Sequence, residues 1–151
     1  MAKILIVGGS LGGLFAANIL LRQGHDVTLL EKATGSLDGR GAGIVTHDAL
    51  ADALRQVGVA VDDTLGVAVT ERITLGTDGQ SLGTMQLPQI LTSWSRLYHM
   101  LKECFPAERY LQGIFVPGLQ NALDAGQAGF RFQLQKGQIF VVNSDFMAGH
   151  E

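Results

Sequence analysis

Two short apolar runs flank a longer apolar segment at the start of the chain. Residues 3–7 read KILIV and residues 26–30 read DVTLL, and each run has the length of a buried strand. The segment between them, residues 11–23, is rich in leucine and alanine and is followed by the polar sequence GHD. Apolar strands on both sides of an apolar helix are typical of a parallel βαβ unit. The pattern therefore predicts a strand, a helix and a second strand.

The turn between the first strand and the helix, residues 8–13, reads GGSLGG. Gly8 allows a tight turn, the small side chain of Ser10 lets the backbone approach a pyrophosphate, and Gly13 lets the helix lie close to the strand. The turn departs from Gly-x-Gly-x-x-Gly because Ser10 replaces the middle glycine. A pyrophosphate would sit on the N–H groups and positive end of the helix that begins near Leu11. A dinucleotide site is predicted, and a glycine turn without a ligand is the alternative.

Glu31 ends the second strand, at about the separation expected for an acid that accepts hydrogen bonds from the ribose hydroxyls of adenosine. An acidic residue at this position favours an unphosphorylated ribose, as in FAD or NAD. Glu31 therefore adds a ribose contact to the predicted site.

Further elements are predicted by the same reasoning. Residues 34–43 hold four glycines and form a loop, either flexible or placed so that its backbone passes close to a flat group. A helix over residues 48–57 is capped by Thr46 or Asp48, a hairpin over residues 65–87 turns at residues 77–80, and a helix capped by Thr92 or Ser93 runs to about Phe105.

The remaining third is predicted to be mostly strand. Residues 109–116 form one strand, residues 130–134 and 139–142 form a second hairpin, and residues 145–149 form a last buried strand. Such a parallel strand needs a following crossover and cover on both faces, but the sequence ends two residues later. We therefore expect an α/β fold that is incomplete at its C-terminus and belongs to a larger protein.

Composition excludes several classes of protein. Hydrophobic residues make up 46% of the chain and charged residues 17%, with a net charge of -3, which indicates an ordered fold and argues against nucleic acid as a partner. Cys104 is the single cysteine, so an internal disulfide is impossible and no set of metal ligands is expected.

Residues 4–21 carry no charge, but clustered glycines, Ser10 and Asn18 argue against a membrane span or a secretory signal. We expect a cytoplasmic location.

The motifs at residues 7–14, 39–45, 91–98 and 108–113 resemble, in this order, the N-terminal part of the class A FAD-dependent aromatic hydroxylases (flavoprotein monooxygenases). The Gly-Gly-Ser form of the turn is similar to the branch typified by 2,6-dihydroxypyridine 3-monooxygenase. The resemblance implies a Rossmann-like FAD-binding βαβ unit, a parallel sheet and inserted β-hairpins over residues 1–151, with most of the substrate domain absent. It also implies FAD as cofactor, NADH or NADPH as reductant, and hydroxylation of a small aromatic or N-heteroaromatic ring.

The resemblance also implies roles for particular residues, while catalytic residues stay unknown. The residues expected to bind the cofactor are Gly8, Gly9, Ser10, Leu11 and Gly13 at the pyrophosphate, Glu31 at the ribose, Lys32 at the adenine edge, Arg40 at the diphosphate, Gly43 at the flavin, and Arg96 beside the cofactor. Trp94 is the alternative to Arg96, and a solvated loop arginine is the alternative for Arg40. His47 faces either the active site or solvent. A homodimer is a further option.

Three hypotheses follow. The chain is the FAD-binding portion of a flavin hydroxylase, an NAD-binding dehydrogenase domain, or a non-catalytic truncated chain. Because later FAD-contacting motifs of the family are absent, we expect weak or no FAD retention and no hydroxylation by this chain alone.

Overall fold

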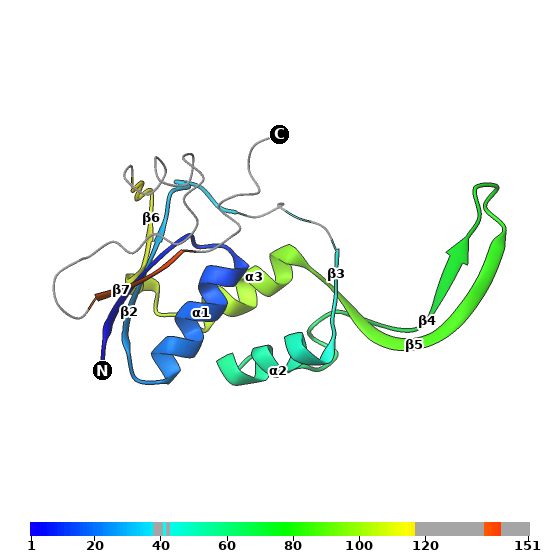
Figure 1. Cartoon of the computed structure of the whole chain (residues 1–151), viewed down its shortest axis with the longest axis horizontal. Helices are drawn as coiled ribbons and strands as arrows, with labels where there is room; N and C mark the ends of the chain where they lie inside the picture. The colour runs from blue at the N-terminus through cyan, green and yellow to red at the C-terminus, as the bar shows by residue number, and fades with distance from the viewer. Residues whose placement is uncertain (38–40, 42, 117–137, 143–151) are drawn as a thin grey trace.

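The structure is a computed structural model that describes residues 1–37, 41, 43–116 and 138–142 (Figure 1). Its elements are β1 (Lys3–Val7), α1 (Leu11–Arg22), β2 (Asp26–Glu31), β3 (Gly43–Val45), α2 (Asp48–Val57), β4 (Val67–Leu75), β5 (Ser81–Ser93), α3 (Trp94–Glu103), η1 (Ala107–Arg109), β6 (Tyr110–Gln112) and β7 (Gln138–Val142).

Four strands form a parallel sheet in the order β6-β2-β1-β7. Lys3 pairs with Asp26 and Val7 with Leu30, so β1 and β2 end side by side at the same edge of the sheet. Helix α1 connects these strands and packs on both, and α2 and α3 pack against α1 (Figure 1). The predicted βαβ unit and the α/β fold class are therefore confirmed.

The core lies between α1 and the sheet. Ile6, Val27 and Leu29 from the strands are fully buried against Leu14 and Ala17 from the helix. Burial of this many branched side chains is the main source of stability in such a layer, at about 1.5–3 kcal/mol for each large side chain. It also fixes α1 relative to the sheet, which places the N-terminus of the helix above the ends of β1 and β2.

One buried polar side chain ties two helices together. The amide of Asn18 in α1 donates hydrogen bonds of 2.9 Å to the carbonyl oxygens of Leu14 and Leu101. Leu101 lies in the last turn of α3, where carbonyls have no partner within the helix. Asn18 therefore completes the hydrogen bonding of the C-terminal end of α3 inside the core.

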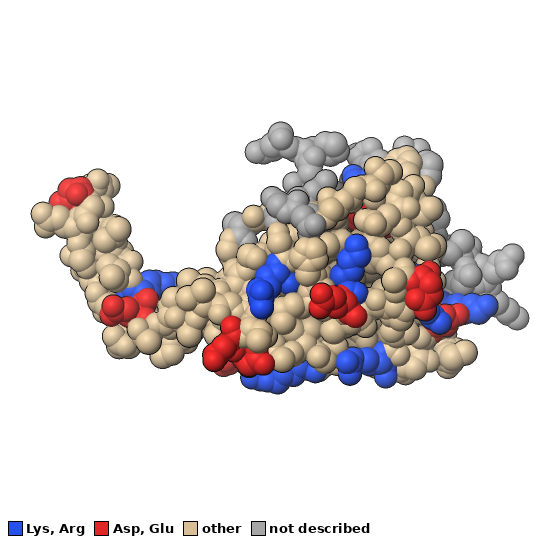
Figure 2. All heavy atoms as spheres, turned by 180° about the vertical axis from the view of Figure 1, so that it is seen from behind, with Lys and Arg blue, Asp and Glu red and all other residues tan. Residues whose placement is uncertain are grey.

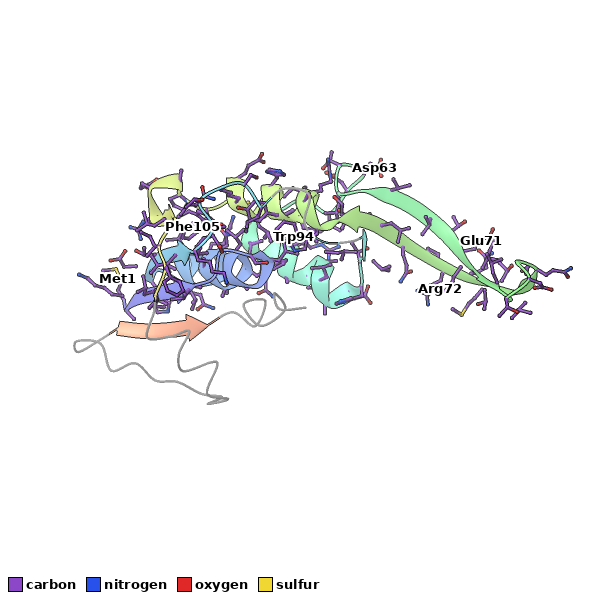
Figure 3. All side chains as sticks on the ribbon, turned by 90° about the horizontal axis from the view of Figure 1, so that it is seen from above. Met1, Asp63, Glu71, Arg72, Trp94 and Phe105 are labelled. Atoms are coloured by element: carbon purple, nitrogen blue, oxygen red, sulfur yellow. The ribbon has the colours of Figure 1, made fainter. Side chains whose placement is uncertain are left out.

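A long antiparallel hairpin, β4 with β5, projects from the body as an arm (Figure 1). Figure 3 shows Glu71 and Arg72 far out along this arm and Trp94 where it joins α3. Ser93, the last residue of β5, is also the N-cap of α3, and its side chain accepts a hydrogen bond from the N–H of Arg96. The hairpin and the Ser93 cap were both predicted, although β5 continues past the predicted end at Leu87 to Ser93.

Two boundary predictions were wrong. His47 rather than Thr46 or Asp48 caps α2, because its Nδ1 accepts a hydrogen bond from the N–H of Leu50 at 3.2 Å. His47 thus has a structural role as a helix cap.

The strand predicted over residues 109–116 is only Tyr110–Gln112. The next residue, Gly113, has a φ of 73°, which is incompatible with an extended strand.

The last described strand pairs with the first strand of the chain. Residues 138–142 form a strand, in agreement with the strand predicted over residues 139–142, and β7 pairs in parallel with β1. Strand periodicity is the same in parallel and antiparallel pairing, so the sequence pattern did not indicate β1 as a neighbour. The predicted hairpin stays a prediction, because its other strand is not described. The predicted strands at residues 130–134 and 145–149 lie outside the described residues.

We expect Asn18→Ala to lower the free energy of unfolding by about 1–3 kcal/mol, because it leaves the buried carbonyl of Leu101 without its partner. Urea unfolding monitored by circular dichroism measures this loss. Gln23→Ala removes an exposed amide at the end of the same helix and should change stability by less than about 0.5 kcal/mol. Equal losses in both variants would contradict the role of Asn18.

Candidate functional site

The glycine turn lies at the edge of the sheet where β1 and β2 end. Gly8 follows β1 with a φ of 107°, a conformation that favours glycine, and its N–H donates a 2.7 Å hydrogen bond to the carbonyl of Leu30. Ser10, with extended backbone, is the N-cap residue of α1. Gly13 is buried in the first turn of the helix, as expected for a residue that allows close packing on the strand. The turn therefore carries the chain from strand to helix over a very short distance.

The carboxylate of Glu31 is buried beside this turn. One oxygen accepts a 2.7 Å hydrogen bond from the N–H of Gly9, and the other accepts a 2.8 Å hydrogen bond from the N–H of Ala33. A carboxylate oxygen has two lone pairs, so each oxygen can still accept a hydroxyl donor. Glu31 thus fixes the turn and keeps capacity to bind a diol.

Gly9 has no room for a side chain. A Cβ built on Gly9 would collide with the hydroxyl of Tyr110 and would lie 2.9 Å from the Cβ of Glu31. The Tyr110 hydroxyl donates a 2.9 Å hydrogen bond to the Gly9 carbonyl across the ends of β1, β2 and β6. Glycine is therefore required here by the close approach of another side chain rather than by an unusual φ.

Tyr110 belongs to a buried cluster that sequence reasoning did not assign to the site. Its hydroxyl lies 3.1 Å from the hydroxyl of Tyr98, which accepts a 3.3 Å hydrogen bond from the ammonium of Lys102. Burial raises the pKa of Tyr110 well above its ordinary value, and the neighbouring Tyr98 and the charge of Glu31 raise it further. Tyr110 therefore stays a neutral donor throughout the physiological pH range.

A hollow opens beside Glu31, at the ends of β1 and β2. The segment after β6 forms its wall, because the N–H of Ile114 donates to the carbonyl of Glu31 at 3.0 Å and the N–H of Gly113 donates to that of Ala33 at 3.2 Å. The residues that line the hollow are Val7, Gly8, Glu31, Lys32, Ile114, Phe115 and Val116. The hollow is small, and it combines apolar walls with one carboxylate and one lysine.

A second group of predicted residues lies at the base of the arm. Gly43 in β3 pairs with Ser93 at the end of β5, which places it beside the start of α3. Gly41 has a φ of 82°, and a Cβ added to it would lie 2.7 Å from the Cβ of Trp94. The backbone at Gly41 therefore lies directly against the Trp94 side chain, which stacks on Tyr98 at a ring distance of 5.0 Å.

Arg96 is exposed in the first turn of α3. The Thr64 hydroxyl and N–H hold the pKa of nearby Asp62 below its ordinary value, and the charge of Arg96 adds to this effect. Trp94 and Arg96 were alternatives, and the structure brings Trp94 into contact with the loop while Arg96 is near Asp62. Arg40 lies outside the described residues.

Three features of the described residues bear on what this chain can bind: its surface charge, its possible metal ligands and the length of its apolar helices. Lys and Arg are interspersed with Asp and Glu over the face in Figure 2. The described part of the chain contains no group of three or more His, Cys, Asp and Glu side chains suited to a metal ion. Within the same residues, no helix is both long and apolar enough to cross a membrane.

A glycine turn at the end of a parallel strand, a following helix and a buried acid at the end of the next strand define a dinucleotide-binding protein. Residues 1–100 match the FAD binding domain family, and the chain belongs to this family. The predicted resemblance to flavin hydroxylases is confirmed.

Several similar proteins are named for pyridine substrates. The chain is 29% identical over 143 residues to 2,6-dihydroxypyridine 3-monooxygenase from Paenarthrobacter nicotinovorans, covering 95% of this chain and 36% of that protein. The solved 2,6-dihydroxypyridine-3-hydroxylase from Arthrobacter nicotinovorans matches 74% of this chain and 28% of its own, with 33% identity and a TM-score of 0.66. A tetrameric 2-methyl-3-hydroxypyridine-5-carboxylic acid oxygenase matches 75% of this chain and 32% of its own, with 25% identity and a TM-score of 0.65. The chain thus spans about a third of the curated relative's length.

We expect Gly9→Ala to destabilise the chain by about 1–3 kcal/mol, because the new methyl group must displace Tyr110 or Glu31. Gly35→Ala is a matched control, since a Cβ at Gly35 would meet open space among the described residues, and it should cost less than about 0.5 kcal/mol. Thermal unfolding of both variants measures the difference. Similar stabilities would show that the close contact at Gly9 does not exist.

The raised pKa of Tyr110 predicts a loss of stability at alkaline pH. The phenol titrates near its ordinary value of 10.0 in the unfolded chain, and folding raises this pKa by burial beside Tyr98 and Glu31, with Lys102 also facing the ring. The contribution is therefore complete below about pH 10, and above it stability falls by up to about 1.4 kcal/mol per pH unit. Urea unfolding of wild type and Tyr110→Phe between about pH 8 and about pH 11 tests this. An equally steep fall in both proteins would contradict the prediction.

Proposed function

We propose that this chain binds FAD as the N-terminal part of the FAD-binding domain of a hydroxylase acting on a pyridine-type ring. The observation that carries the proposal is the geometry of Glu31, which holds Gly9 in the turn and borders the hollow beside it. Family membership selects FAD among the dinucleotides, so the dehydrogenase alternative is set aside.

The adenosine half of FAD fits the edge of the parallel sheet. The diphosphate would lie over Gly8, Gly9, Ser10, Leu11 and Gly13, where backbone N–H groups and the positive end of α1 favour an anion. Glu31 would accept the ribose hydroxyls, and Lys32 and residues 114–116 would flank the adenine.

The flavin half would lie toward the base of the arm. The backbone of Gly41 and Gly43 can approach a flat ring closely, and Trp94 packs against Gly41. Arg96, and Arg40 from the same loop, would supply positive charge near the cofactor. These residues would orient the ring and exclude water from one of its sides.

The chemistry supplied by bound FAD in such enzymes is hydride acceptance from NADH or NADPH and activation of dioxygen. Two relatives are named for 2,6-dihydroxypyridine and 2-methyl-3-hydroxypyridine-5-carboxylic acid, which are hydroxylated pyridines. We propose a small electron-rich aromatic or N-heteroaromatic ring as the substrate class. The role assigned to this chain is cofactor binding, with no hydroxylation by residues 1–151 alone.

Titration of the purified chain with FAD, NAD and FMN, followed by calorimetry and by the visible absorption of the flavin, tests the proposal. FAD should bind most tightly, because it alone combines the adenosine diphosphate recognised by the turn with the flavin ring. FMN lacks the adenosine and should bind at least about tenfold more weakly, a loss of about 1.4 kcal/mol. FAD should also be lost on a desalting column, as expected for weak retention. A chain that binds NAD as well as or better than FAD would refute the assignment.

A further inference from the structure

Gly9 is held from both sides of its backbone by buried side chains. Its N–H donates to the carboxylate of Glu31 at 2.7 Å, and its carbonyl accepts from the hydroxyl of Tyr110 at 2.9 Å. The C=O and N–H of a trans peptide point in opposite directions. Because the Gly9 carbonyl points at Tyr110, the N–H of Ser10, in the same peptide, points away from Tyr110.

The direction of every hydrogen bond behind this carbonyl is determined. A carbonyl only accepts, so Tyr110 must use its single proton on Gly9. Tyr98 must then donate to the oxygen of Tyr110, and the oxygen of Tyr98 accepts from the ammonium of Lys102. The result is a one-way chain from a cation on α3 to the glycine turn.

Lys102 is placed to strengthen this chain. Its ammonium lies 4.7 Å from the centre of the Tyr110 ring and 5.4 Å from the centre of the Tyr98 ring. A positive charge at the far end polarises successive hydroxyl donors, and such chains are stronger than their separate bonds. Tyr98 and Tyr110 are buried and Lys102 is half-buried, and the low dielectric around the two tyrosines increases the effect.

We propose that Tyr110, supported through Tyr98 by Lys102, is a positioning residue that orients the Gly9–Ser10 peptide so that its N–H faces the diphosphate of the cofactor. This inference rests on the proposed FAD-binding role. It assigns to strand β6, which carries Tyr110, a function at the turn in addition to those of the glycines and Glu31.

The test compares ADP and adenosine binding to the complete chain by calorimetry, in wild type, Tyr110→Phe and Asn18→Ala. ADP carries the diphosphate and adenosine does not. Tyr110→Phe should weaken ADP binding by about five- to tenfold, the effect of one lost hydrogen bond, and change adenosine binding by less than about twofold. Asn18→Ala, which is expected to lose similar stability away from the turn, should leave both affinities within about twofold.

Each outcome either supports or overturns the positioning role of Tyr110. A Tyr110→Phe variant that binds ADP like wild type, or loses ADP and adenosine affinity equally, overturns the positioning role while the FAD proposal stands. A wild-type chain that binds neither ADP nor FAD overturns both. If Tyr110→Phe does not fold, Lys102→Met tests the same chain of hydrogen bonds: ADP binding weakened by more than about threefold, with adenosine binding within about twofold of wild type, supports the proposal. Unchanged ADP binding in that variant overturns it.

Discussion

The backbone of Gly9 lies where β1, β2 and β6 end together, and this close approach constrains the site around it. The parallel register brings Glu31 beside the turn, and the continuation of β6 past Tyr110 runs along the end of β2. A side chain on Gly9 would push these elements apart. The turn, the buried acid and the wall of the hollow therefore depend on one another, and none would keep its geometry if the other two moved.

Much of the fold was predictable because its signals are local. The apolar runs that form β1 and β2 stand out from their polar flanks, and α2 ends where predicted because Gly58 adopts the left-handed conformation that closes a helix. The helix start was harder, because histidine is an uncommon N-cap and His47 acts through a ring nitrogen rather than an oxygen. The pairing of β7 could not be deduced, since strand periodicity does not state the direction of the neighbour.

The candidate site also has a part that the sequence predicts and a part that it does not. The glycine turn and Glu31 lie within a single βαβ unit, so their spacing in the sequence reflects their spacing in space. Tyr110 is 101 residues from Gly9, and its meeting with the turn depends on how β6 adds to the sheet. A tyrosine near the start of a predicted strand carries no sign of that contact. Only the general rule that parallel strands end at one edge could have drawn attention to it.

The arm formed by β4 and β5 gives the molecule two levels of local stability. Its apolar side chains, including Val67, Ile73 and Leu82, are largely exposed, so its strands are joined mainly by backbone hydrogen bonds. Segments with little buried surface open at a lower free energy than the core to which they are attached. The hairpin can therefore open and re-form from its tip while the parallel sheet and its helices stay folded. Amide hydrogens along the arm would then exchange with solvent sooner than those of β1 and β2.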